Sequence, residues 1–318
     1  MTLMHQIYNQ HLLSACPPDV DLTEWTEFRT MMAQASNLEE LDHPLQIDVE
    51  LNAGCNMACP FCIHGYEKIA NNKLDRKKFE KVLKEAVSIG VKAVKFNYIN
   101  EPMLRKDLEE IIRWTRDQGI INIYMVTNGT LLTPKRRESL MQSGLTKLFV
   151  SLDAVTAETY NKQRLSGQFN KVVANVLAFI KERNELGQQF PLVRVSFLKN
   201  QINIHEEAEF TEFWTGKADL IAFQKMNEVP DKDTGLTIAD VDMPTKGCDF
   251  PFKQLVIDDD GEILPCCKLA GKKLPLGHID TMTLQQAWKS PKMQHLRLIH
   301  SSDDWQKHTI CRNCMLND

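Results

Sequence analysis

From about residue 46 onward, the sequence repeats one pattern: a short β-rich run, a polar loop, an amphipathic segment and a glycine. The pattern predicts six strands, at residues 46–51, 93–99, 122–127, 147–152, 192–198 and 220–226. Several of these runs are almost continuously apolar, as expected for parallel strands that are covered on both faces. Because sequential right-handed crossovers place parallel strands side by side, we expect an α/β fold built on a partial, TIM-like (β/α)6 barrel.

The segments between the strands have helical periodicity and end at glycines. Residues 79–87 place their apolar side chains on one face of a helix that is expected to begin near Asp75 and to stop at Gly90. A second helix is expected to start at Thr133-Pro134 and to be closed by Gly144. In barrels of this kind, active sites lie at the C-terminal ends of the strands. The loops that follow the strands are therefore where functional residues are expected.

Proline, glycine and aspartate interrupt the repeat at about residues 228–247, and we interpret this segment as a domain junction. The predicted parts are an N-terminal helical segment (1–45), a core barrel (46–227) and a small cysteine-rich α+β domain (228–318). In the small domain, Asp260-Gly261 provides the turn of a β-hairpin between residues 252–257 and 262–264. Two helices are predicted after it, at residues 283–290 and 292–299.

Composition excludes several function classes. The 318 residues carry a net charge of −4 with positive and negative side chains interspersed, so no basic face is predicted for nucleic acid or an anionic membrane. No segment reaches the length of a membrane span, and residues 1–21 lack a signal-peptide pattern. We therefore predict a cytoplasmic location. Nine cysteines in such a chain indicate metal or cluster binding rather than disulfides, because the cytosol keeps thiols reduced.

Three of the cysteines follow the first predicted strand. Cys55, Cys59 and Cys62 leave three and then two residues between the thiols. Cysteine thiolates are the usual ligands of iron–sulfur clusters, and a four-iron cubane held by only three of them has one iron without a protein ligand. Such an open metal position is where a substrate or cofactor binds, whereas structural metal sites are closed. A zinc site or a set of buried thiols is the alternative interpretation.

The spacing of this triplet resembles the signature of the radical S-adenosylmethionine (SAM) superfamily. The resemblance implies a [4Fe–4S] cluster whose open iron chelates the amino and carboxylate groups of SAM. An electron then cleaves SAM to a 5′-deoxyadenosyl radical. The resemblance covers the predicted barrel from about residue 46 to 226, and its motifs follow four successive strands, which makes it a fingerprint rather than a lone pattern.

Two residues of this fingerprint are assigned next to the cluster and the SAM amino group. Phe61 stands where the superfamily often has an aromatic residue beside the cluster. Glu101 belongs to a segment similar to the family's Gly-Gly-Glu-Pro motif, although Ile99 and Asn100 replace the two glycines. The resemblance implies that the Glu101 carboxylate accepts a hydrogen bond from the SAM ammonium group.

Four further residues follow the third and fourth strands. Asn128 lies in the segment Thr127–Leu132, which is similar to a family segment. Ser151 and Asp153 are candidates for the ribose hydroxyls of SAM, and Arg164 is the candidate partner of its carboxylate. Taken singly, an Asn-Gly turn or a serine at a strand end is more often local turn chemistry than a ligand.

A second cysteine group lies in the predicted small domain. Its members are Cys248, Cys266, Cys267, Cys311 and Cys314. Together with Gly261 on the predicted hairpin, their spacing resembles the SPASM/twitch extension of radical SAM enzymes. Full SPASM domains carry more cysteines and two auxiliary clusters, which this chain, ending at Asp318, lacks. We therefore expect one auxiliary [4Fe–4S] cluster, held by Cys248, Cys266, Cys311 and Cys314. A four-thiolate zinc site is the alternative.

Cys267 is the thiol left over. Adjacent residues on a strand point to opposite faces, so Cys266 and Cys267 are not expected to bind the same cluster. The chain resembles radical SAM epimerases in which a cysteine donates a hydrogen atom to a substrate radical. A Cys267 that faces the barrel mouth would have this role, which makes it the candidate catalytic residue. A buried small hydrophobic side chain is the alternative.

The resemblance implies an enzyme in which the cofactors perform the difficult chemistry and the protein aims them. We expect hydrogen-atom abstraction from a small polar substrate, a sugar or an aminocyclitol, that leads to dehydrogenation, epimerisation or dehydration. A flavodoxin- or ferredoxin-type electron donor is the expected partner. A peptide-modifying maturase is the first alternative, although the region before the barrel is short for a peptide-recognition domain. An iron–sulfur electron carrier or a zinc-binding module without turnover is the alternative from another class.

Overall fold

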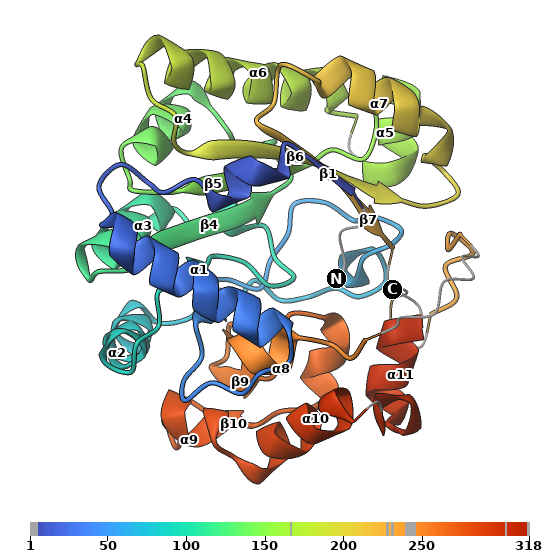
Figure 1. Ribbon diagram of the computed structural model, residues 1–318. Helices are drawn as coiled ribbons and strands as arrows, with labels where there is room; N and C mark the ends of the chain where they lie inside the picture. The colour runs from blue at the N-terminus through green and yellow to red at the C-terminus, as the bar shows by residue number, and fades with distance from the viewer. Residues whose placement is uncertain are drawn as a thin grey trace.

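The computed structural model describes residues 6–165, 167–226, 229, 232–238, 246–302 and 304–316. In this part of the chain, ten strands form one sheet in the order β1-β7-β6-β5-β4-β3-β2-β8-β9-β10 (Figure 1). Six consecutive strands pair in parallel, and their bounds are β2 (Gln46–Val49), β3 (Ala93–Lys95), β4 (Asn122–Thr127), β5 (Lys147–Ser151), β6 (Leu192–Lys199) and β7 (Leu220–Lys225). The predicted open (β/α)6 barrel is therefore confirmed.

Helices connect the parallel strands and cover the outer face of the sheet (Figure 1). They are α2 (Arg76–Ser88), α3 (Leu108–Asp117), α4 (Pro134–Met141), α5 (Ala157–Arg164), α6 (Phe169–Glu185) and α7 (Glu207–Trp214). Short 3-10 helices are η1 (Gln10–Ser14), η2 (Ile63–Gly65), η3 (Pro102–Leu104), η4 (Ile204–Glu206), η5 (Leu269–Lys273) and η6 (Asp304–Lys307). None of the helices in the described residues combines the length and apolar character that crossing a bilayer requires.

The predicted start of α2 is confirmed by its cap. The Asp75 side chain accepts hydrogen bonds from the amides of Lys77 (2.9 Å) and Lys78 (3.0 Å), which would otherwise lack partners in the first turn. The helix ends at Ser88, two residues before Gly90. The buried residues of α2 are Phe79, Val82, Leu83 and Ala86, which lie on the predicted apolar face.

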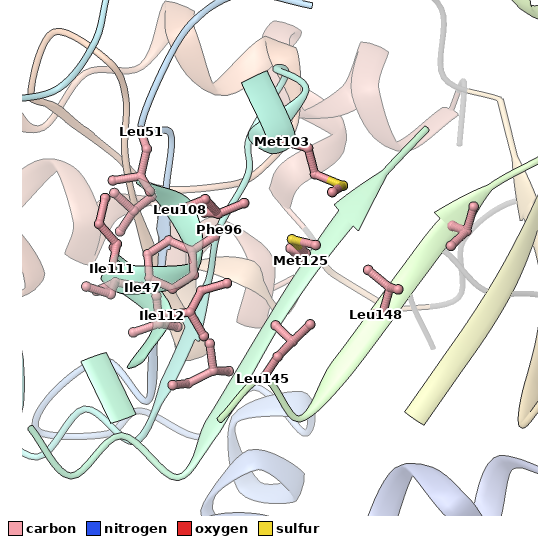
Figure 2. Close-up of a cluster of buried hydrophobic side chains, with 14 of the residues drawn as sticks. Ile47, Leu51, Phe96, Met103, Leu108, Ile111, Ile112, Met125, Leu145 and Leu148 are labelled. Carbon is pink, nitrogen blue, oxygen red and sulfur yellow. The ribbon is translucent and has the colours of Figure 1, made fainter. Parts of the chain in front are cut away.

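The main core lies between the sheet and these helices. Figure 2 shows side chains of the strands packed against α3. Fully buried members are Ile47, Phe96, Met125 and Leu148 from the sheet region and Leu108, Ile111 and Ile112 from α3. Each buried side chain of this size contributes about 1.5–3 kcal/mol relative to an exposed one. This core fixes the strands and hence the positions of the loops that follow them.

The N-terminal segment adds both a strand and a helix to the barrel. β1 (Gln6–Tyr8) pairs antiparallel with β7. α1 (Leu22–Ser36) packs Trp25 and Phe28 against Leu45 and Ala93, at the start of β2 and β3. The predicted helix of this segment is therefore present.

The C-terminal part continues the same sheet. Its elements are α8 (Phe250–Lys253), β8 (Gln254–Ile257), β9 (Glu262–Leu264), β10 (Gly277–His278), α9 (Leu284–Trp288), α10 (Pro291–Ser301) and α11 (Thr309–Leu316). β8 pairs parallel with β2 and antiparallel with β9. The predicted hairpin forms with Gly261 at φ 100°, a conformation that glycine adopts without strain. Its first strand starts at Gln254, because Pro251 opens the short helix α8 before it.

One sheet thus runs through all three predicted parts. The boundaries at residues 45 and 227 therefore stay predictions, and the second of them adjoins residues outside the described ranges.

The face of the sheet away from the helices is polar. Asp48, Lys95 and Tyr124 are register neighbours on β2, β3 and β4 and share this inner face, because side chains alternate along each strand. Asp48 is fully buried and forms an ion pair with Lys95. Burial raises the pKa of Asp48, and the Lys95 ammonium group opposes this shift. The inner face therefore carries charged and hydroxyl groups at this level of the barrel.

Replacing either partner of the Asp48–Lys95 pair alone is expected to destabilise the fold by about 3–5 kcal/mol, because the remaining charge stays buried without its partner. The double variant Asp48→Asn with Lys95→Met is expected to lose less than the sum of the two single losses. Thermal unfolding of anaerobically purified protein measures this, with Lys181→Gln, from an exposed ion pair, as the control. Strictly additive losses would contradict the prediction.

Candidate cluster and cofactor sites

The cysteine triplet lies in the loop between β2 and α2. Cys59 is 5% exposed, and Cys55 and Cys62 are half-buried. The amide of Cys62 donates to the carbonyl of Cys59 (3.0 Å), so the loop folds back on itself. Burial raises the pKa of the Cys55 thiol to about 12, and the nearby Glu101 carboxylate and the other two thiols contribute to this shift. The three thiols therefore share one site, where a metal cation would favour the thiolate forms that burial disfavours.

Arg164, the last residue of α5, reaches this loop. Its Nη1 donates to the Sγ of Cys59 (3.7 Å), and its guanidinium lies over the Phe61 ring, 5.3 Å from the ring centroid. Its Nε is buried and has no hydrogen-bond partner among the described residues. A buried N–H without a partner costs free energy unless a ligand accepts from it. The structure thus brings Phe61 and Arg164 together at the triplet and leaves one donor available beside it.

Asp153 holds Arg164 in place. Its Oδ2 accepts from the Nη2 of Arg164, and its Oδ1 accepts from the amide of Leu198 (2.7 Å). The residue is almost fully buried, with φ at 63°, a conformation that aspartate tolerates better than most residues. Both carboxylate oxygens are therefore engaged within the protein, and about two of the four acceptor positions of the carboxylate remain. The predicted ribose role stays a prediction.

Glu101 connects the loops that follow β3 and β4. Its Oε1 accepts from the amide of Met103 (3.1 Å) and the hydroxyl of Thr127 (2.7 Å), and its Oε2 accepts from the amide of Asn128 (2.8 Å). The residue is 2% exposed, and burial raises its pKa despite these donors. A carboxylate offers about four acceptor positions, so three are used here and one is left on Oε2.

The triplet loop is attached to both of these loops. The amide of Glu101 donates to the carbonyl of Gly54 (3.0 Å). Asn128 Nδ2 donates to Asn56 Oδ1 (2.8 Å), and Asn56 Nδ2 donates to Thr130 Oγ1 (2.9 Å). Asn56 was not predicted from the sequence as a site residue, although its place directly after Cys55 is a signal that points to it.

Ser151 lies at the C-terminal end of β5 on the inner face, half-exposed. Its register neighbour on β6 is Ser196. The Ser196 hydroxyl is 2% exposed and has no hydrogen-bond partner among the described residues. Two serine residues are therefore neighbours on the inner face, closer to the C-terminal ends of the strands than the Asp48–Lys95 pair. Sequence reasoning missed Ser196 because a serine within a predicted strand carries no signal of its own.

The four cysteines predicted for the auxiliary cluster line one cavity. Cys248, Cys266, Cys311 and Cys314 all face it, and apolar side chains form much of the remaining wall. Cys311 and Cys314 lie three residues apart on α11, on one face of that helix. Four thiols around one cavity suit a four-thiolate zinc site as well as a cluster, so both predictions remain.

Two histidines accept hydrogen bonds from the backbone of these cysteines. His300 Nδ1 accepts from the amide of Cys248 (3.1 Å), and His308 Nδ1 accepts from the amide of Cys311 (3.3 Å). His300 also lines the cavity, whereas His308 does not. Neither residue was predicted from the sequence, because isolated histidines on the two segments give no recognisable spacing.

Cys267 points away from this cavity. It packs against Tyr98, Val256 and Leu264 on the inner side of the sheet, and the Lys95 and Asp48 charges act on its thiol. Cys266 and Cys267 therefore face different surroundings, as the alternation of side chains predicts. Cys267 lies toward the polar interior of the barrel rather than with the auxiliary set.

The donor sets fit the cofactors that the sequence predicts. The triplet supplies three thiols beside an unpartnered Arg164 Nε, and the cavity of the small domain supplies four thiols within an apolar wall. Thiolates are the ligands that iron–sulfur clusters require, and an arginine N–H is a suitable donor to a carboxylate.

Solved structures with similar folds bind SAM. BtrN in complex with AdoMet and 2-DOIA has a TM-score of 0.57 and 19% identity, over 85% of this chain and 92% of BtrN. The protein anSMEcpe with bound AdoMet has a TM-score of 0.63 and 15% identity, over 86% of this chain and 88% of anSMEcpe. Streptococcus suis SuiB bound to SAM has a TM-score of 0.62 and 17% identity, over 86% of this chain and 70% of SuiB. At these identities the likeness shows the fold alone.

Curated relatives match part of the chain. A probable GTP 3′,8-cyclase of Metallosphaera sedula is 32% identical over 178 residues, which are 55% of this chain and 54% of the relative. An AdoMet-dependent heme synthase of Methanosarcina barkeri is 35% identical over 135 residues, 42% of this chain and 38% of the relative. The chain thus spans about half the length of the first and less of the second.

Family models cover both parts of the fold. A model of the radical SAM superfamily matches residues 49–193, and a model of the SPASM iron–sulfur cluster-binding domain matches residues 248–315. The first match contains the triplet and its neighbouring loops, and the second contains the four-cysteine cavity. These matches imply SAM, a [4Fe–4S] cluster and auxiliary iron–sulfur binding as cofactors. The chain therefore belongs to the radical SAM superfamily and carries a SPASM-type auxiliary cluster domain.

Proposed function

We propose that this radical SAM protein acts on a small polar substrate, a sugar or an aminocyclitol, by dehydrogenation, epimerisation or dehydration. The observation that carries the proposal is the three-thiol loop with the Arg164 Nε–H left available beside it. When SAM is bound at the open iron and receives one electron, it supplies a 5′-deoxyadenosyl radical that removes a hydrogen atom from the substrate. An external flavodoxin- or ferredoxin-type protein provides the electron.

In this proposal, the protein residues bind and orient the cofactor. Cys55, Cys59 and Cys62 each bind one iron and leave the fourth iron to SAM. Arg164 donates to the SAM carboxylate, and its contact with Cys59 links that carboxylate to the cluster. Asp153 orients Arg164, and its remaining acceptor positions suit a ribose hydroxyl of SAM.

The remaining residues of the fingerprint surround the other parts of SAM. The acceptor position left on Glu101 Oε2 suits the SAM ammonium group, and Asn128 fixes the loop that carries this contact. Phe61 covers the Arg164 guanidinium and shields it from water. Ser151 offers its hydroxyl to the ribose, and Ser196 is a second candidate for the same role.

The polar inner face supports a small hydrophilic substrate. Lys95 and Tyr124 are partly exposed and provide an ammonium and a hydroxyl group that match the hydroxyl groups of a sugar or cyclitol, while the buried Asp48 holds Lys95 in place. Likeness to BtrN, which was solved with AdoMet and 2-DOIA, is compatible with this choice. A peptide substrate is the second candidate, because SuiB was solved with the precursor peptide SuiA and covers a similar share of this chain.

The small domain binds one auxiliary [4Fe–4S] cluster in the proposal, through Cys248, Cys266, Cys311 and Cys314. Four thiols in one buried cavity support a cluster that is closed by protein ligands and exchanges electrons without binding substrate. Cys267 faces the barrel interior instead and is the candidate hydrogen-atom donor. The sulfur radical that donation leaves would return to the thiol with one electron from the auxiliary cluster and one proton from solvent.

Cys59→Ala is expected to remove one of two clusters. After anaerobic reconstitution, iron and sulfide fall from about eight each per chain to about four, and 5′-deoxyadenosine no longer forms with SAM and reductant. Cys16→Ala, outside both sites, is the control and keeps both values. Wild-type protein with about four irons and bound zinc would contradict the auxiliary cluster, and two clusters without 5′-deoxyadenosine would favour an electron carrier.

Arg164→Lys is expected to weaken SAM binding about 10- to 100-fold, because a charge-assisted hydrogen bond contributes about 1.5–3 kcal/mol and lysine lacks the Nε donor. Titration of the reduced cluster with SAM, followed by electron paramagnetic resonance, measures the affinity. Lys162→Gln changes an exposed lysine of the same helix and serves as the control. An unaltered affinity in Arg164→Lys would remove Arg164 from the SAM site.

Cys267→Ala tests the hydrogen donor together with the substrate class. We screen aldoses, inositols and aminocyclitols for compounds that stimulate 5′-deoxyadenosine formation, and a cysteine-containing peptide serves as comparator. A C-deuterated form of an active substrate then shows whether deuterium is transferred to 5′-deoxyadenosine. In D2O, the wild-type product of an epimerisation carries one solvent deuterium on carbon, because a thiol exchanges its proton. The variant still cleaves SAM but gives no such product. Full turnover by the variant would exclude Cys267, and stimulation by the peptide alone would favour the maturase.

A further inference from the structure

His300 and His308 make the same backbone contact in different surroundings. His300 Nδ1 accepts a hydrogen bond from the backbone amide of Cys248, and His308 Nδ1 accepts one from the backbone amide of Cys311. His300 is 2% exposed and lines the four-cysteine cavity, whereas His308 is half-exposed and does not line it. The chain thus contains a matched pair of histidines that differ in their access to the cavity.

The backbone contact fixes the tautomer of His300. A backbone N–H can only donate, so the Nδ1 that faces the Cys248 amide carries a lone pair and no proton. The neutral imidazole then carries its proton on Nε2. Among the hydrogen bonds of the described residues, none involves His300 Nε2. His300 thus lines a cavity whose wall is mostly apolar, and its ring keeps one donor that no described residue engages.

We propose that the Nε2–H of His300 donates a hydrogen bond to a sulfur atom of the auxiliary cluster and thereby raises the reduction potential of that cluster. The inference rests on the proposed function, in which the four cysteines of the cavity bind a [4Fe–4S] cluster. Reduction adds negative charge to the cluster, and a hydrogen-bond donor stabilises the reduced form more than the oxidised one. In this role the His300 ring contacts the cluster directly and favours electron uptake by it.

Three substitutions separate the two contacts of the ring. His300→Asn keeps an acceptor where Nδ1 stands but has no group at the place of Nε2. His300→Gln brings its amide N–H2 to about the place of Nε2 and retains a donor. His308→Asn alters the matched residue outside the cavity. Each is made in full-length protein that also carries Cys55→Ala, Cys59→Ala and Cys62→Ala, so that the auxiliary cluster gives the only signal.

The midpoint potential of the reconstituted cluster is measured by redox titration with electron paramagnetic resonance, next to iron and sulfide content. In His300→Asn, the equilibrium constant for reduction is expected to fall about tenfold, which is about 59 mV for one electron. His300→Gln is expected to shift less in the same direction, and His308→Asn is expected to leave the potential unchanged. Iron and sulfide stay at about four each in all variants.

Two results would overturn the inference. The first is an unchanged potential in His300→Asn at full iron content, and the second is an equal shift in His308→Asn, which would assign the effect to the amide contact alone. If His300→Asn does not assemble the cluster, His300→Gln decides. A midpoint potential that matches the wild type supports the donor, and one that is lower by about 59 mV contradicts it. A parent protein that binds zinc or no iron refutes the proposed auxiliary cluster instead, so the two failures are distinguishable.

Discussion

Parallel pairing of β2 through β7 is the constraint on which the candidate SAM site depends, because it brings the carboxyl ends of six strands to one edge of the sheet. The triplet follows β2, Glu101 follows β3, Asn128 follows β4 and Asp153 follows β5. Hydrogen bonds between successive loops then connect these residues, from Gly54 to Glu101 and from Glu101 to Asn128. The site is therefore a set of loops joined by hydrogen bonds. The hydrophobic core shown in Figure 2 fixes the strand ends from which these loops begin.

Buried charge is tolerated here because each charged group has several partners. Glu101 accepts three hydrogen bonds, and Asp153 accepts from Arg164 and from the backbone of β6. Burial raises the pKa of both carboxyl groups, so additional positive partners stabilise their ionised forms. A ligand with both an ammonium and a carboxylate group would bind Glu101 through the first and Arg164 through the second. The predicted contacts of Glu101 and Arg164 with SAM therefore support each other.

Much of the fold and part of the site could be predicted from the sequence. Strand positions followed from apolar runs, and the cysteine groups followed from spacing, because both signals are local. Long-range pairing was not predictable: nothing in residues 254–257 indicates that β8 joins β2, and nothing in Arg164 indicates that Asp153 and Cys59 are its partners. Asn56, Ser196 and His300 were missed for the same reason, since each gains its meaning from a contact with a distant residue.

The pairing of β8 with β2 has a consequence for electron transfer. The strand that leads into the triplet and the strand that leads toward the auxiliary cysteines are joined by backbone hydrogen bonds within one sheet. The spacing between the triplet loop and the hairpin that leads to Cys266 is consequently set by covalent and ladder geometry. Electrons that pass between clusters held at these two places would therefore cross a separation that the sheet maintains.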